Sequence, residues 1–268
     1  MGMLIFVVLL FIFGLVIGSF LNVVIYRTVH DESFVFGRSK CPSCKKQIAW
    51  YDNVPLVSFF LLRGKCRSCK KQISWAYPFI ELITGLLFVW WFFIGFTFFQ
   101  LSSRPFTVLQ PLFWLVVGIL LIVVFFSDLL YGIIPDIAVA GLTLLGLFYR
   151  LLLFTSGIMF PMDFWKTLGG ALGAFLLFFM LWVGTKRRGI GLGDVKFAFP
   201  MGLITGWPGI ALALFLSFTI GAVVSLGTVV AGQKKLTSRI AFGPFLVLAT
   251  VLVLLWGEDL LRWYVAML

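Results

Sequence analysis

The chain has 268 residues, of which 62% are hydrophobic, 18% aromatic and only 12% charged, and its mean hydropathy is +1.11. An ordinary globular chain carries about 25% charged residues, so these values indicate a polytopic membrane protein. They exclude intrinsic disorder, collagen-like repeats, coiled coils and secreted disulfide scaffolds, because each of these needs high polarity, a short repeat or a dense set of cysteines.

The net charge is +11, from 21 Lys and Arg against 10 Asp and Glu. Ten basic residues lie between residues 27 and 75, seven lie in two later clusters at 186–196 and 234–239, and four lie elsewhere. Lys and Arg accumulate in cytoplasmic loops of membrane proteins. The distribution therefore predicts cytoplasmic loops and both termini outside, with no nucleic-acid partner.

Apolar windows of about 20 residues can cross a bilayer, and we expect eight spanning segments. They cover 3–26, 77–99, 109–127, 136–154, 166–184, 197–206, 208–231 and 242–256. The sixth is short and interrupted by Gly202, Gly206 and Pro208. The first lacks a basic segment before it, so we expect it to be retained rather than cleaved as a signal peptide.

The predicted fold is an all-α polytopic membrane protein with about eight transmembrane helices and a small cytoplasmic four-cysteine loop like a zinc ribbon. We expect two regions. Residues 1–99 hold the first two segments and the cysteine loop at 27–76, and residues 100–268 form the rest of the membrane core.

All four cysteines lie in the first basic loop, in two CxxC pairs that begin the near-repeats CPSCKKQIAW and CRSCKKQISW. Cys41, Cys44, Cys66 and Cys69 supply the four thiolates of a closed tetrahedral zinc site, although 21 residues between the pairs slightly exceed the usual spacing. The alternative is a pair of disulfides. A cytoplasmic loop disfavours it, because thiols are kept reduced there.

Two aspartates are predicted at the inner membrane face. Asp128 follows an uninterrupted apolar run from Leu112, and Asp194 lies in GIGLGDVKF, just before the short sixth window. A carboxylate at bilayer depth is costly, which makes it a functional candidate. If the two come close, they favour one shared proton, which suits the acid and base roles of an aspartic protease.

Four other residues near these sequences have predicted roles. Gly191 and Gly193 let the backbone turn tightly and let a substrate backbone pass close to Asp194. Asp136 opens the fourth window and is expected to be an N-cap. Glu81, one turn into the second window, is either an interfacial anchor or a substrate contact.

Ordered blocks along nearly the whole chain resemble the type IV prepilin peptidases, membrane aspartyl proteases of the GxGD class. These blocks are GSFLNVVIYR, the two CxxC pairs, WYDNVPL, LRGKCRSC, YPFIELITG, SDLLYGIIPD, GLGDVKF and AFGPF. The resemblance implies that Asp128 and Asp194 are catalytic. It also implies a bacterial inner-membrane enzyme that cuts prepilins and pseudopilins after a glycine, at the cytoplasmic face, beside membrane lipid. Oligomeric state is left open.

Members of this family with the cysteine loop often methylate the new N-terminal amine with S-adenosylmethionine, and this resemblance extends that expectation to the present chain. No glycine-rich motif for that cofactor is visible. Because the new amine must be delivered without leaving the membrane surface, we expect the methyl-donor site beside the loop and the inner ends of the first two segments, where Asn22, Asp52, Asn53 and Glu81 supply polar groups. Asn22 and Lys196 are further candidates for positioning substrate. The rival interpretation is a cation- or proton-coupled transporter with a regulatory zinc loop.

Overall fold

The computed structural model describes residues 2–33, 36–95, 106–187, 189–232 and 241–267. These ranges are helical, with two isolated β-bridges and no sheet. The chain divides into two compact units, Met1–Val123 and Val124–Leu268, and the boundary falls within helix α5, Phe106–Tyr131. The all-helical membrane fold predicted from the sequence is confirmed.

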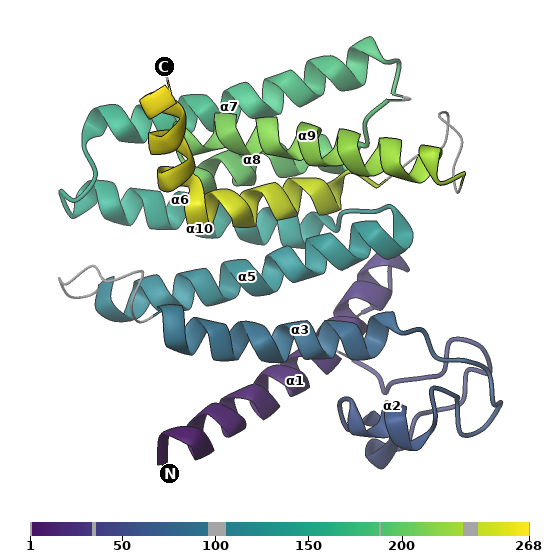
Figure 1. The fold of residues 1–268 in the computed structure, drawn as a ribbon. Coiled ribbons are helices and arrows are strands. Elements are labelled where there is room, and N and C mark those ends of the chain that lie inside the picture. The colour runs from purple at the N-terminus through teal and green to yellow at the C-terminus, as the bar shows by residue number, and fades with distance from the viewer. Residues whose placement is uncertain (1, 34–35, 96–105, 188, 233–240, 268) are drawn as a thin grey trace. The chain divides into compact units, whose positions relative to one another are not determined.

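The first unit is built on two long helices, α1 (Gly2–Val29) and α3 (Ala76–Trp90), which cross closely in Figure 1. α3 continues as the π-helical turn η2, Trp91–Gly95. A Cβ on Gly14 would lie 2.8 Å from the Gly85 Cα, and one on Gly18 would lie 2.7 Å from the Glu81 Cα. Gly14 and Gly18 form a GxxxG pair, a pattern that lets transmembrane helices approach closely.

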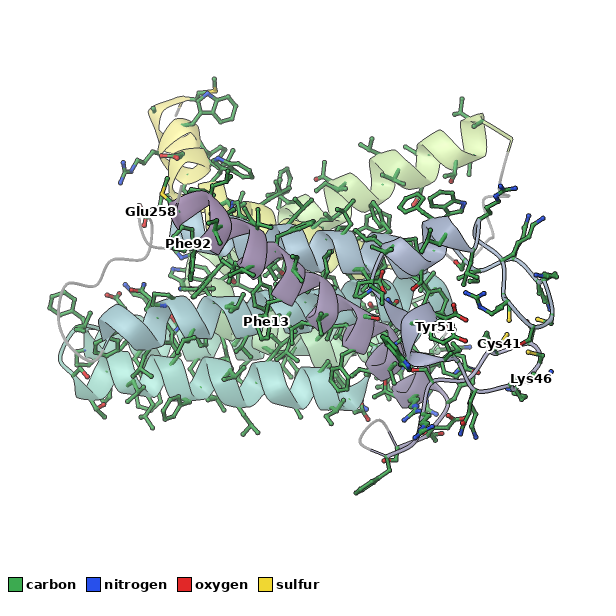
Figure 2. All side chains as sticks on the ribbon, turned by 90° about the horizontal axis from the view of Figure 1, so that it is seen from below. Phe13, Cys41, Lys46, Tyr51, Phe92 and Glu258 are labelled. Carbon is green, nitrogen blue, oxygen red and sulfur yellow. The ribbon has the colours of Figure 1, made fainter. Side chains whose placement is uncertain are left out.

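The cysteine loop joins these two helices and contains only short elements. They are η1 (Trp50–Asn53) and α2 (Val57–Leu61). Figure 2 shows Cys41, Lys46 and Tyr51 of this loop beyond one end of the long helices of the first unit. The loop therefore adjoins the carboxyl end of α1 and the amino end of α3.

The second unit comprises the end of α5 and five further helices. They are α6 (Asp136–Thr155), α7 (Pro161–Gly184), α8 (Leu192–Thr205), α9 (Gly209–Val230) and α10 (Gly243–Met267). α8 is the central helix and packs against α6, α7, α9 and α10. Its contact with α7 is tight, because a Cβ on Gly202 would lie 2.5 Å from the Ala171 Cα.

Seven of the described helices are long and apolar enough to cross a membrane, and they correspond to seven of the eight predicted segments. The remaining one is α8. It has 14 residues and is about 21 Å long, shorter than the roughly 30 Å hydrocarbon core. A short helix is tolerated where protein surrounds it, and nine of the 14 residues of α8 are buried.

Arg150 supplies hydrogen bonds to the last carbonyl groups of α8. Its Nε donates to the Leu203 carbonyl at 2.8 Å and its Nη2 to the Ile204 carbonyl at 3.0 Å. The last carbonyls of a helix lack partners within the helix and carry partial negative charge. A half-buried arginine of α6 thus satisfies the carboxyl end of α8.

Part of the charge pattern lies outside the described residues, namely Arg104, Arg188, Lys234, Lys235 and Arg239. The orientation of the termini, and the division of the chain at residue 99, stay predictions.

Candidate active site and metal centre

One end of the second unit gathers the segments that carry Asp128, Asp136 and Asp194. Figure 1 shows the carboxyl ends of α5 and α7 on the same side as the amino ends of α6, α8 and α10. Asp128 lies in the last turn of α5 and Asp194 in the first turn of α8. Both predicted aspartates therefore lie at this end of one unit.

Asp128 is buried, with 7% of its surface exposed. Its Oδ2 accepts a hydrogen bond of 2.8 Å from the backbone N–H of Gly243, the first residue of α10. A Cβ at residue 243 would lie only 2.6 Å from the same oxygen. Glycine at this position is therefore what allows the backbone to approach the carboxylate.

Asp194 is equally buried, with 6% of its surface exposed. Its Oδ2 accepts a hydrogen bond of 3.1 Å from the backbone N–H of Gly191, the N-cap of α8. The aspartate thereby caps its own helix. A Cβ on Gly193 would lie 2.9 Å from the Cβ of Ile134, so the small residue lets α8 pack on the α5–α6 connection.

The two carboxylates interact. Asp128 is close enough to act electrostatically on Asp194. Each presents one oxygen to a backbone N–H group, and the hydrogen bonds described at both carboxylates involve only that oxygen. Two close, buried carboxylates favour a state in which they share one proton. This arrangement can supply an acid and a base to the same reaction.

Asp136 and Lys196 form an ion pair beside these aspartates. Lys196 Nζ lies 2.8 Å from Asp136 Oδ1, and the two side chains are 40% and 74% exposed. The prediction that Asp136 is an N-cap was wrong. Pro135 occupies the cap without a side-chain hydrogen bond, and Asp136 is the first helical residue. An acid there still suits the positive end of the helix.

In the first unit, the cysteine repeat of the sequence is also a repeat of structure. Cys41 N donates to the Lys46 carbonyl and Cys66 N to the Lys71 carbonyl, both at 2.9 Å. Each turn contains a lysine with positive φ, 58° at Lys45 and 59° at Lys70. A single β-bridge closes each half, Lys40 to Gln47 and Lys65 to Gln72. The two halves therefore present their thiols in the same way.

The four thiols converge on one point. All four Sγ atoms lie within 4.8 Å of one another, and those of Cys41 and Cys69 are 3.9 Å apart. A tetrahedral zinc with Zn–S bonds of about 2.3 Å would place its sulfurs about 3.8 Å apart. All four cysteines are free thiols. The geometry thus fits a four-cysteine metal site and contains neither disulfide of the alternative interpretation.

The thiols are inequivalent. Burial raises the pKa of Cys41, but backbone N–H groups of Cys44 and Ser43 and the neighbouring thiols outweigh it and lower that pKa to about 6. At Cys69 the Lys71 backbone N–H lowers the pKa, while burial and the other three thiols raise it to about 11. The backbone N–H groups around Cys41 thus favour its thiolate, the form that binds a metal.

Three of the polar residues expected beside the methyl-donor site make contacts within the first unit. Glu81 Oε2 accepts from the Leu56 N–H at 2.8 Å, and Asn22 Nδ2 donates to the Tyr77 carbonyl at 3.1 Å. Asp52 forms an ion pair with Arg67, whose hydrogen bond holds the pKa of this carboxyl below its usual range.

These contacts brace the loop. Leu56 has a positive φ of 58°, which is unusual for a branched side chain. The hydrogen bond from the Leu56 N–H to the Glu81 carboxylate stabilises this conformation. Of the expected cofactor-binding groups, only Asn53 is exposed. The position of the S-adenosylmethionine site beside the loop stays a prediction.

Two structural residues were missed from the sequence. Arg27 is buried and donates to the carbonyls of Ser33, Phe36, Gly37 and Arg38, although its sequence signal is that of an ordinary basic loop residue. Gly243 lies in the AFGPF block, but the block itself does not show which residue its glycine approaches.

Comparison with known proteins places both regions in one family. Residues 12–94 match the bacterial peptidase A24 N-terminal domain, and residues 115–226 match the type IV leader peptidase family. The first match contains the four cysteines, and the second contains Asp128 and Asp194. Gly243 lies beyond both.

Curated relatives match along almost the whole chain. A prepilin leader peptidase/N-methyltransferase of Aeromonas hydrophila is 32% identical, over 96% of this chain and 92% of its own. One from Bacillus subtilis is 30% identical, over 97% and 98%. One from Pseudomonas aeruginosa is 31% identical, over 97% and 93%.

No solved structure matches the chain. The identity and coverage of the curated relatives, together with the two domain matches, establish that the chain belongs to the type IV leader peptidase family.

Proposed function

We propose that this protein is an aspartyl endopeptidase that removes the leader from type IV prepilins and pseudopilins after a glycine, and then methylates the new N-terminus. The observation that carries the peptidase assignment is the buried pair Asp128 and Asp194, each held by a backbone N–H at a helix start. The relatives' names supply the substrate class and the second activity.

The pair performs the hydrolysis as an acid and a base. One carboxylate takes a proton from a water molecule, which attacks the peptide carbonyl, while the protonated partner donates a hydrogen bond to the carbonyl oxygen. When the C–N bond breaks, the leaving amine takes up a proton and the pair returns to one shared proton. Asp136 and Lys196 lie beside this reaction but already neutralise each other.

Both sites are proposed to face the cytoplasm of a bacterial inner membrane, with both termini outside. The support is the basic character of the segments that follow the first, fifth and seventh predicted spans in the sequence. In this arrangement the leader is cut without leaving the side on which it is made.

The cysteine loop is proposed to hold one structural zinc through Cys41, Cys44, Cys66 and Cys69. The thiol spacing supports this assignment. Four thiolates close the coordination sphere, so the metal shapes the loop and takes no part in proteolysis.

S-adenosylmethionine is proposed as the methyl donor on the strength of the relatives' names, and no residue of this chain is assigned to it. When bound, it supplies an electrophilic methyl group to the new amine. What the chain itself provides is a loop braced by Glu81 and Asn22 between α1 and α3.

The decisive experiment incubates the purified full-length protein with a model prepilin and S-adenosylmethionine, and follows product mass. Loss of the leader and a gain of one methyl group report the two activities separately. Asp194→Asn should cut nothing yet methylate a synthetic substrate that already begins at the mature amine. A fully active Asp194→Asn protein would overturn the peptidase assignment, and the transporter interpretation would then be tested by ion flux.

A further inference from the structure

The proposed function raises the question of where the leader docks. A leader that precedes a membrane helix and stays in the cytoplasm is enriched in Lys and Arg by the positive-inside rule. An acidic side chain on the enzyme would therefore favour its binding. The inner loops of this chain are strongly basic, so few residues can provide one.

Most acids are unsuitable by position or pairing. Asp52 is held by Arg67, with only 9% of its side chain exposed. In the second unit, Asp163 lies in the first turn of α7 and so at the opposite end of that helix from Asp194. Glu258 and Asp259 lie 15 and 16 residues along α10 from Gly243, about 22 Å away.

Asp136 is the remaining acid of the second unit outside the catalytic pair, and its position is favourable. It opens α6, eight residues after Asp128, and it contacts Lys196, two residues after Asp194. Its side chain is 74% exposed. An ion pair exposed to this degree contributes little stability, so it opens at little cost when another cation competes.

We infer that Asp136 is a specificity-determining residue that binds a cationic residue of the substrate's leader in exchange for Lys196. In the free enzyme Lys196 forms an ion pair with the Asp136 carboxylate. When substrate binds, a Lys or Arg of the leader takes its place at Asp136, beside the catalytic pair. The inference rests on the proposed peptidase function and assigns Lys196 the role of an internal competitor for this contact.

The test compares two model prepilins that differ only in the leader, one with Lys and one with Gln beside the cleavage site. Their kcat/KM ratio measures the preference for charge. Asp136→Asn should lower this ratio about two- to fivefold through KM, the size expected of an exposed ion pair. Lys196→Met should raise it, because the competitor is gone. Asp163→Asn, an exposed acid at the far end of α7, is the matched control.

A purely structural tie between α6 and α8 predicts a different result, in which both variants lose activity on both substrates and the ratio stays constant. That result, or an unchanged ratio with full activity, overturns the inference while the peptidase assignment stands. A wild-type protein that cuts neither substrate overturns the assignment and the inference with it.

Discussion

The cysteine loop and the aspartate pair are organised in opposite ways. The loop is two copies of one short turn, each closed by its own backbone hydrogen bonds, with thiols that lie partly at the surface. The aspartate pair is assembled from α5 and α8, 66 residues apart, with the start of α10 a further 49 residues on. A local site depends on its own ligands, whereas an assembled site depends on the packing that brings its parts together.

The largest effect is expected at the assembled site. Asp128→Asn and Asp194→Asn should each reduce cleavage of a model prepilin by about 10²- to 10⁴-fold, the usual contribution of a general acid or base. Asn keeps the size of the side chain, so the protein should remain folded in detergent by circular dichroism. Zinc content should be unchanged, because the ligands lie in the other unit. Cleavage within twofold of wild type in either variant would contradict the assigned pair.

Gly243→Ala tests whether packing alone can disable the pair. Its Cβ would lie 2.6 Å from the Asp128 carboxylate, so backbone and carboxylate must separate. Misplacement of a catalytic group by about 1 Å can cost roughly a hundredfold in rate, and we expect kcat for cleavage to fall on that scale. Alanine favours helix more than glycine does, so thermal stability should change little.

The control for this prediction is Gly173→Ala in α7, where a Cβ meets nothing within 4 Å. If Gly243→Ala cleaves as well as Gly173→Ala, the approach of α10 to Asp128 is irrelevant to catalysis.

Cys41→Ser tests the local site. Removing one of four thiolates should release most of the bound zinc, measured by elemental analysis of purified protein, and should expose the loop to limited proteolysis. Methylation of a precut substrate should fall more than cleavage of a prepilin, because only the former is proposed to use the loop. Ser43→Ala, within the same turn, is the control. Equal loss of both activities would show that the loop braces the entire enzyme.

The smallest effect concerns pH. Arg67 holds the pKa of Asp52 below its usual value, so the ion pair stabilises the folded loop above the ordinary aspartate pKa near 4. This stabilisation is lost as the pH falls through the lowered value. Proteolysis of the loop should therefore accelerate about two- to fivefold in acid, and Asp52→Asn should remove that acid-dependent step. An unaltered acid response in the variant would exclude this pair as its source.

The sequence was sufficient to predict what lies close together in the chain. Seven spanning helices could be predicted because the length of an apolar segment is a local property. The convergence of the four thiols could be predicted because the spacing of each CxxC pair is local as well. The short length of α8 was recognisable from Gly206 and Pro208, but the interruption expected at Gly202 was wrong, because the helix continues through that residue. What the hydropathy pattern does not contain is the direction in which each side chain packs.

Contacts between segments far apart in the sequence could be identified only in the structure. The pairing of Gly243 with Asp128 spans 115 residues, and that of Arg150 with Leu203 spans 53. Arg27 has the sequence signature of a solvated basic residue, yet its guanidinium binds four carbonyls inside the loop. Asp136 was expected to cap α6, but the proline before it took that position and left the carboxylate to pair with Lys196.

The donors to Asp128 and Asp194 are both main-chain amides, and this has a consequence for inhibitors and resistance. An inhibitor that mimics the hydrated peptide can reach these carboxylates only through the oxygens that Gly243 and Gly191 leave unoccupied. Only an exchange to proline deletes an amide donor. A variant that weakens these two contacts must therefore introduce proline or move the backbone, as a larger residue at 243 would, and either change disturbs the carboxylate pair proposed to cut the substrate.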